Sequence, residues 1–276
     1  MPAIEEKRIS KKINTRPIGV FDSGVGGLSV LLKLKRLLPK ENFVFLADQL
    51  YVPYGEKNKK ELVNRVYKIT DYLRKRHDIK MMVVACNTAT CAAIGELRNK
   101  YSLPIVGTVP AIKKAAENTK TKKIAVISTP STSKSLALQK LIKDYCQGIK
   151  VLNIGCKDLE DAVERGELMG GEVRRLLFKY LDRIKNSKID QLVLGCTHYP
   201  FLKQAIVKIV GPGVNLLDGG EGIARHAKSL LSNYLMENNA EKKEKIIYLT
   251  TGDPKKFSKI ASKLMKEKIK SRKVAF

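Results

Sequence analysis

The sequence has no tryptophan, and aromatic residues make up only 6% of its 276 positions. It also has no CxxC pair and an odd number of cysteines, which are Cys86, Cys91, Cys146, Cys156 and Cys196. Disulfide frameworks and zinc knuckles need paired cysteines at regular spacing. The pattern therefore favours free thiols in a reducing compartment, and we expect no bound metal.

Long apolar runs are absent as well. No stretch approaches the roughly 20 apolar residues that a membrane-spanning helix needs. The charged start, MPAIEEKRISKKINTRP, lacks the apolar segment of a secretory signal. Hydrophobic residues still make up 43% of the chain, which is typical of globular proteins. We therefore expect a cytoplasmic protein with no membrane partner.

Acidic residues are scarce relative to basic ones: 27 Asp and Glu face 53 Lys and Arg, which gives a formal charge of +26. This excess is typical of proteins that bind nucleic acid or anionic membranes. It also fits solvated helix faces with a mild attraction for an acidic substrate. We favour the second interpretation, because the lysines are dispersed over predicted helices and few aromatic side chains are available to stack on bases. We expect no specific nucleic-acid partner.

Short apolar runs alternate with amphipathic stretches after a polar, basic segment, residues 1–16, which we expect to be a mobile tail. Apolar runs without polar alternation are typical of strands covered on both faces. Strands alternating with helices predict a parallel α/β sheet with ligands at the carboxyl ends of the strands. The runs are Ile18–Phe21, Phe43–Leu46, Met81–Ala85, Ile105–Gly107, Ile124–Ile127, Val151–Ile154, Leu192–Gly195, Val214–Leu217 and Ile246–Leu249.

A weak internal repeat divides the chain. PIGVFDSGVGGLSV aligns with KIAVISTPSTSKSL, which places Ile18 on Ile124, and MMVVACNT aligns with QLVLGCTH, which places Cys86 on Cys196. In both halves a cysteine follows a buried strand and begins a polar loop. The repeat predicts two similar α/β lobes that bring the two strand ends to one cleft.

The two thiols suit proton transfer at a carbon atom. Cysteine has an ordinary pKa of about 8.5, so both of its protonation states are accessible near neutral pH. Inverting a carbon centre needs a base on one face and an acid on the other, which Cys86 and Cys196 would supply from opposed lobes. The alternative is that both are buried cysteines that fill apolar space. We favour the catalytic role, because the two cysteines occupy matching positions after a buried strand in the two halves. His198 lies two residues beyond Cys196, near enough to assist it.

Two further motifs point to the same cleft. In FDSGVGG, glycines allow close backbone approach to an anion, and Asp22 and Ser23 project from the strand end. The motif alternatively forms a capped turn, or a partial dinucleotide fingerprint with Asp48 as the ribose-binding acid. Ser29 at the third glycine position argues against the fingerprint. In VPYG, Tyr54 and Gly55 would offer backbone donors to a carboxylate, unless the segment is a plain turn.

FDSGVGGLSV, VPYGEK, VACNTAT and LGCTHYPFL closely resemble the signature segments of bacterial glutamate racemases, in the aspartate/glutamate racemase superfamily. YLTTGDPKKF resembles the closing strand and helix of that family, so the resemblance covers about residues 17–265. It implies two pseudo-symmetric α/β lobes with the active site between them. The first would comprise residues 17–110 and 218–276, and the second residues 111–217.

The resemblance also implies an activity: cofactor-independent interconversion of L- and D-glutamate by proton transfer between two cysteines, which feeds peptidoglycan synthesis. It implies catalytic roles for Cys86, Cys196, Asp22 and His198. The substrate contacts it implies are Asp22, Ser23, Tyr54, Gly55, Asn87, Thr88, Thr197 and His198, and the possible assisting residues are Glu164 and Thr132.

Two segments depart from the family pattern. CKDLEDAVERG stands where the family has Cys-Pro and a more apolar run, and Leu138 replaces a common Tyr. The alternative function is a racemase of the same superfamily that acts on another acidic amino acid such as aspartate. Other classes are a glutamate-binding protein without α-proton exchange and a nucleic-acid-binding protein. We expect a homodimer, without a predicted geometry.

Overall fold

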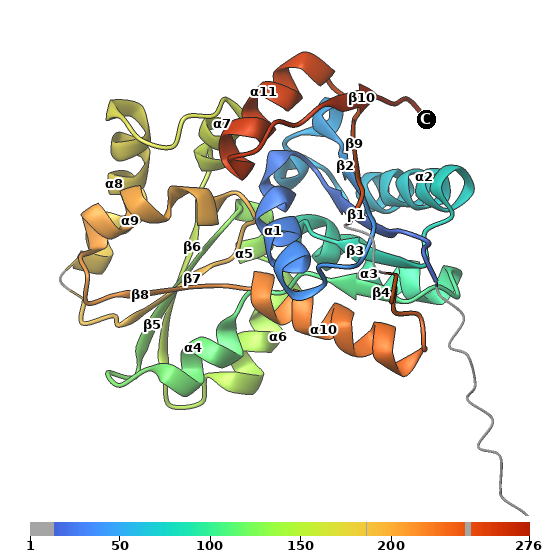
Figure 1. Ribbon diagram of the computed structural model, residues 1–276. Helices are drawn as coiled ribbons and strands as arrows, with labels where there is room; N and C mark the ends of the chain where they lie inside the picture. The colour runs from blue at the N-terminus through green and yellow to red at the C-terminus, as the bar shows by residue number, and fades with distance from the viewer. Residues whose placement is uncertain (1–13, 186, 241–243) are drawn as a thin grey trace, which may run out of the picture.

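The computed structural model describes residues 14–185, 187–240 and 244–276 and shows two parallel sheets flanked by helices (Figure 1). The larger sheet has the spatial order β10-β9-β2-β1-β3-β4, and the smaller has the order β6-β5-β7-β8. Every neighbouring pair of strands in both sheets is parallel. The predicted α/β class is therefore confirmed.

The strands form from the apolar runs of the sequence, and each run expected to be a strand is one. Their bounds are β1 (Ile18–Asp22), β2 (Phe43–Ala47), β3 (Met81–Val84), β4 (Ile105–Gly107), β5 (Lys123–Ser128), β6 (Lys150–Gly155), β7 (Gln191–Leu194), β8 (Asn215–Asp218) and β9 (Ile246–Thr250). One further strand, β10 (Ser271–Lys273), is not predicted from the sequence, because it is short, polar and at the sheet edge.

Helices connect the strands and cover both faces of the sheets. They are α1 (Leu28–Leu37), α2 (Lys59–His77), α3 (Asn87–Lys100), α4 (Ile112–Asn118), α5 (Pro130–Ser133), α6 (Leu136–Tyr145), α7 (Leu159–Glu164), α8 (Gly171–Lys185), α9 (Lys203–Val210), α10 (Gly220–Asn233) and α11 (Pro254–Met265). Short 3-10 helices are η1 (Val25–Gly27), η2 (Gln49–Tyr51), η3 (Tyr54–Glu56) and η4 (Tyr199–Leu202). Among the described residues, no helix has the length and apolar character to cross a bilayer.

The two sheets share one topology. In the first, β1 lies between β2 and β3, and β4 flanks β3; in the second, β5 lies between β6 and β7, and β8 flanks β7. The registers also agree, because Phe21 pairs with Val84 and Ile127 pairs with Leu194. Each pair lies directly before the loop that carries a cysteine. The internal repeat predicted from the sequence is therefore present in the fold, with β9 and β10 extending the first sheet.

The two lobes share a hydrophobic core. A single cluster of buried apolar residues includes Val25 of η1, Leu159 of α7 and Tyr199 of η4. The chain passes between the lobes after β4 and returns after β8, where α10 packs along α1 (Figure 1). This packing holds the carboxyl ends of the two sheets towards each other. The domain boundaries at residues 110 and 217 stay a prediction.

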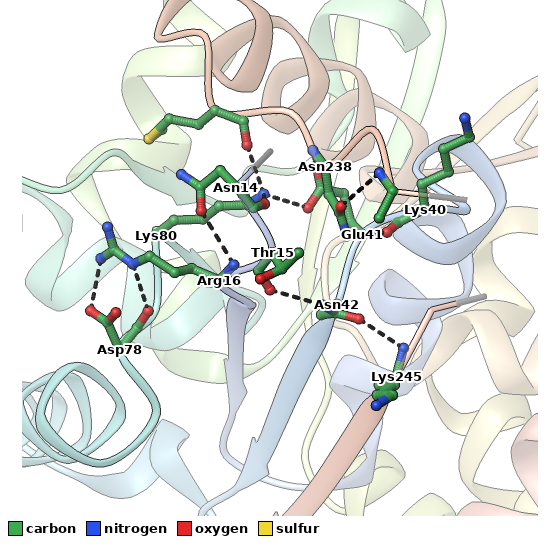
Figure 2. A network of polar contacts seen from close by, with 12 residues as sticks. Asn14, Thr15, Arg16, Lys40, Glu41, Asn42, Asp78, Lys80, Asn238 and Lys245 are labelled. Carbon is green, nitrogen blue, oxygen red and sulfur yellow. Dashed lines mark hydrogen bonds and ion pairs between the residues drawn. The ribbon is translucent and has the colours of Figure 1, made fainter. Parts of the chain in front are cut away.

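A polar network fixes the start of the described chain to the first lobe (Figure 2). The Lys80 ammonium contacts the Glu41 carboxylate at 2.7 Å and donates to the carbonyl oxygen of Asn14 at 2.9 Å. Arg16 pairs with Asp78 at 2.9 Å. The mobile tail predicted over residues 1–16 is therefore wrong for residues 14–16, which contact the first lobe. These contacts were not predictable, because polar partners that are distant in sequence leave no periodic pattern. Residues 1–13 of that tail lie outside the described residues.

Candidate active site

Two cysteines follow the matching strands β3 and β7 and meet at one small cavity. Cys86 is the N-cap of α3, and its Sγ accepts a hydrogen bond from the Ala89 N–H at 3.5 Å. Cys196 follows β7, and its side chain is also buried. The cavity is lined by Ser23, Val52, Pro53, Tyr54, Gly55, Cys86, Asn87, Thr88, Thr129, Glu160, Cys196, Thr197 and His198. Both lobes contribute to this wall.

Most residues predicted for the site lie on the cavity wall, whereas Asp22, Glu164 and Thr132 do not. These three are packed behind it and contact the wall residues Thr197, His198 and Thr88. Thr132 Oγ1 lies 3.2 Å from Thr88 Oγ1, which is also 3.1 Å from Thr129 Oγ1. This hydroxyl cluster joins the N-terminus of α3 to α5 across the lobe boundary.

His198 connects the Cys196 thiol to a carboxylate. Its Nδ1 lies 3.5 Å from the Cys196 Sγ, and its Nε2 lies 2.7 Å from the Glu164 Oε1. Burial lowers the pKa of His198, but the contacts with Cys196 and Glu164 outweigh it and hold the pKa well above its ordinary value. Glu164 is itself fixed by hydrogen bonds from the Val25 N–H at 2.6 Å and from Gln49 at 2.7 Å.

Asp22 lies behind the other thiol. One carboxylate oxygen accepts hydrogen bonds from the Gly27 N–H and, at 3.2 Å, from the Thr197 hydroxyl. The other oxygen has no hydrogen-bond partner among the described residues. Asp22 thus holds the FDSGVGG turn in place by binding Gly27, the residue directly before α1. Ser23, by contrast, faces the cavity with its Oγ 3.7 Å from the Cys86 Sγ.

The VPYG segment is held by a buried carboxylate. Asp48 accepts hydrogen bonds from Arg65 at 2.6 and 2.8 Å and from the Tyr54 hydroxyl at 2.7 Å. It also accepts from Thr251 at 2.9 Å. These contacts place Gly55 on the cavity wall. They also occupy Asp48, so it does not serve as the ribose-binding acid of a dinucleotide site.

Both cavity thiols are harder to ionise than the sequence suggests. Burial raises the pKa of Cys86 well above its ordinary value, and the negative charge of Asp22 raises it further. Burial also raises the pKa of Cys196, while His198 opposes that rise. The N-terminus of α3 provides a field that favours thiolate at Cys86, whereas Cys196 is followed by the short helix η4. Desolvation outweighs this favourable field.

Two polar wall residues, Thr129 and Glu160, were not predicted from the sequence. Thr129 follows β5 as Ser23 follows β1, so the internal repeat contained the signal that would have found it. Glu160 lies in α7, inside the segment that departs from the family pattern. Burial raises the pKa of Glu160 to about 7. No sequence motif marks it, because its position depends on how the lobes meet.

A larger hollow of about 1010 Å³ lies elsewhere at the lobe junction, where α4 and α10 begin. Its wall includes Lys33, Lys113 and Lys203 but no cysteine. Within the described parts of the chain, no group of three or more His, Cys, Asp and Glu side chains is arranged to hold a metal ion. The paired thiols make the smaller cavity the candidate active site.

Comparisons with known proteins agree with this geometry. Residues 18–227 match the family model described as Asp/Glu/Hydantoin racemase. A glutamate racemase from Herpetosiphon aurantiacus is 40% identical over 245 residues, covering 89% of this chain and 96% of that protein. One from Clostridium kluyveri is 40% identical over 254 residues, covering 91% and 98%.

Solved structures give the same result. A glutamate racemase isoform from Bacillus anthracis superposes with a TM-score of 0.87 at 32% identity, covering 95% of this chain and 98% of that one. A glutamate racemase from Francisella tularensis, in complex with D-glutamate, superposes with a TM-score of 0.81 at 28% identity over the same shares. Matching thiols in two matching lobes, together with these similarities, show that the chain is a racemase of the Asp/Glu/Hydantoin racemase family.

Proposed function

We propose that this chain is a glutamate racemase that moves the α-proton of glutamate between Cys86 and Cys196. One observation carries the proposal: two thiols from equivalent strand ends of two similar lobes line one cavity. The glutamate racemase relatives support the choice of substrate. So does the D-glutamate complex of the Francisella tularensis protein, whose fold this chain shares.

Neutral donors suit the two carboxylates of glutamate. Ser23, Thr88 and Thr197 present hydroxyls on the cavity wall, and the N-terminus of α3 directs free backbone N–H groups to the same place. Asn87 also lies on the wall, and its side-chain amide nitrogen is a further neutral donor. We assign these groups to the α-carboxylate. Gly55 also lies on the wall, and we assign its backbone N–H to the side-chain carboxylate.

The surroundings of the two thiols favour opposite protonation states. A protonated His198, 3.5 Å from Cys196, stabilises a thiolate there. The negative charge of Asp22 favours a protonated thiol at Cys86. Of the two thiols, Cys196 therefore ionises more readily and serves as the base in one direction, with Cys86 as the acid. The enantiomer whose α-proton faces Cys196 is the one that reacts in this direction.

The reaction follows from this arrangement. The Cys196 thiolate takes the α-proton on one face, and the electron pair of the broken C–H bond remains on the α-carbon and its carboxylate. The Cys86 thiol then gives its proton to the opposite face, which leaves Cys196 protonated and Cys86 as thiolate. Because an α-proton is far less acidic than a thiol, positioning and fixed donors must lower most of the barrier. Asp22 and His198 adjust the thiols without touching the α-carbon.

The physiological role follows from the product. We propose that D-glutamate from this reaction supplies peptidoglycan synthesis, and that the enzyme works in the cytoplasm as a homodimer without a cofactor. The small cavity and its neutral donors suit a short diacid. Aspartate is the alternative substrate, because it differs from glutamate by a single methylene group.

The test is circular dichroism of L-glutamate incubated with the purified protein, with chiral chromatography of the product. We expect decay to a racemic mixture, and much slower reaction of L-aspartate. Cys86→Ser and Cys196→Ser should each lower the rate by at least about 10³-fold, since a serine hydroxyl is too weak an acid. Cys91→Ser, a half-buried thiol that does not line the cavity, is the matched control. Near-native turnover by either active-site variant would contradict the proposal.

A further inference from the structure

Glu160 lies on the cavity wall, and its carboxyl group has no role in the proposed proton transfer. It comes from α7 in the second lobe and faces Gly55 in the first. A Cβ atom placed on Gly55 would lie 3.9 Å from the Glu160 Oε1 and 3.7 Å from the Thr129 Oγ1. Its carboxyl forms no hydrogen bond or ion pair with any residue that the structure describes. Glu160 thus reaches the lobe boundary with its polar atoms available to a ligand.

The groups around Glu160 are mostly acidic. Its own helix carries Asp161 and Glu164, and β1 contributes Asp22. On η3 the nearest charge, Glu56, is paired with Lys157 at 3.5 Å. The remaining groups that interact with it, from the ends of β6 and β7, are Cys156, Cys196, His198 and Tyr199.

These surroundings make the carboxyl sensitive to pH near neutrality. Burial and the nearby carboxylates together raise the pKa of Glu160 to about 7, against the opposing charge of His198. A neutral carboxylic acid offers an O–H donor, whereas a carboxylate only accepts. The state of Glu160 therefore decides whether the wall next to Gly55 attracts or repels an anion.

The geometry points to a role in substrate selection, which rests on the proposed function. We propose that protonated Glu160 donates a hydrogen bond to the side-chain carboxylate of glutamate next to Gly55, and that ionised Glu160 repels this carboxylate. The enzyme would then bind its substrate more weakly as the pH rises. Glu160 is a binding residue in this account, so its ionisation should change KM rather than the proton transfer.

The experiment compares KM for L-glutamate between pH 6 and 8.5 in the wild type, Glu160→Gln and Glu160→Leu. The wild-type KM should rise by up to about tenfold per pH unit above pH 7. Glu160→Gln keeps a neutral donor, so its KM should stay low and its kcat profile should follow the wild type. Glu160→Leu has neither donor nor charge, so its KM should be high already at pH 6 and change little with pH.

Glu117→Gln removes an exposed acid on α4, which pairs with Lys113, and serves as the control with wild-type behaviour. Titration of His198 and of the thiols acts on kcat, so the difference in KM between Glu160→Gln and the wild type isolates Glu160. A Glu160→Gln KM that rises in parallel with the wild type would overturn the inference. So would a KM raised at every pH in Glu160→Gln, which would show that an ionised Glu160 binds the substrate ammonium. Absence of turnover in the wild type would instead refute the proposed racemase function.

Discussion

Glu164 Oε1 lies 2.7 Å from His198 Nε2, and both side chains are largely removed from solvent. The two residues come from different elements, α7 and the loop before η4, so the contact exists only in the folded chain. Glu164 does not reach the cavity, yet its charge helps to keep the imidazole protonated beside Cys196. Through this contact, a residue behind the wall affects the charge of a group on the wall.

Removing the Glu164 charge should therefore shift the pH dependence of the reaction. In Glu164→Gln, the pKa of His198 falls, and the imidazolium that supports the Cys196 thiolate is lost at lower pH. We expect the alkaline limb of the kcat profile to move to lower pH and the rate at pH 8 to drop by about 10²-fold. The measurement is kcat against pH by circular dichroism.

Glu167→Gln is the matched control for this experiment, because Glu167 is exposed and pairs with Arg165 away from the cavity. It should retain the wild-type pH profile. An unchanged alkaline limb in Glu164→Gln would show that Glu164 does not support the charge of His198.

Thiol modification should separate the cavity cysteines from the others. Because burial raises the pKa values of Cys86 and Cys196, iodoacetamide should inactivate the enzyme slowly at pH 7 and faster as the pH rises. Glutamate should protect both residues but not Cys91, which mass spectrometry of the peptides can show. A metal chelator should leave the rate unchanged. Loss of activity on chelation, restored by a metal ion, would contradict the two-thiol mechanism.

Removing one partner of the buried pair of Lys80 and Glu41 should cost much stability. Lys80→Met leaves a buried carboxylate without its cation, which should lower the free energy of unfolding by about 3–5 kcal/mol. The double variant with Glu41→Gln should recover much of the loss. Lys140→Met, which breaks the exposed pair with Asp144, should change stability by less than about 1 kcal/mol. Urea unfolding measures all three, and equal losses in Lys80→Met and Lys140→Met would contradict the account.

Truncation tests where the folded chain begins. Removing residues 1–13 should leave stability and turnover unchanged, because that sequence has no apolar periodicity. Removing residues 1–16 deletes the contacts of Asn14 and Arg16 shown in Figure 2 and should lower the free energy of unfolding by about 1–3 kcal/mol. Thermal unfolding of both truncated chains provides the comparison. Equal stability of the two would show that the network contributes little.

The sequence predicted the strands of both sheets up to β9 because strands covered on both faces must be apolar throughout. It missed β10, whose residues Ser271, Arg272 and Lys273 carry no apolar signal. This strand is defined by its pairing with β9, and such pairing between distant segments leaves no local pattern.

The candidate site, like the fold, could be predicted from the sequence only in part. Cys86 and Cys196 were predictable because the repeat places both at strand ends, and His198 is close to Cys196 in the chain. The position of Glu160 next to Gly55 depends on how the two lobes pack together, and its raised pKa depends on burial. Neither could be predicted from the sequence. The position of Asp22 behind the wall likewise follows from its hydrogen bonds with Gly27 and Thr197. None of these features is encoded by a spacing of residues.

The most direct test of the central claim is a racemisation of L-glutamate in D₂O, stopped early in the reaction. If Cys86 and Cys196 each serve one face, the hydrogen taken from the substrate stays on one thiol, and the product receives deuterium from the other. Mass spectrometry of the separated enantiomers should find deuterium in nearly all D-glutamate and almost none in the remaining L-glutamate, and the reverse when the reaction starts from D-glutamate. Substrate-derived hydrogen at the α-carbon of the product would show that a single base serves both faces, and would contradict the account.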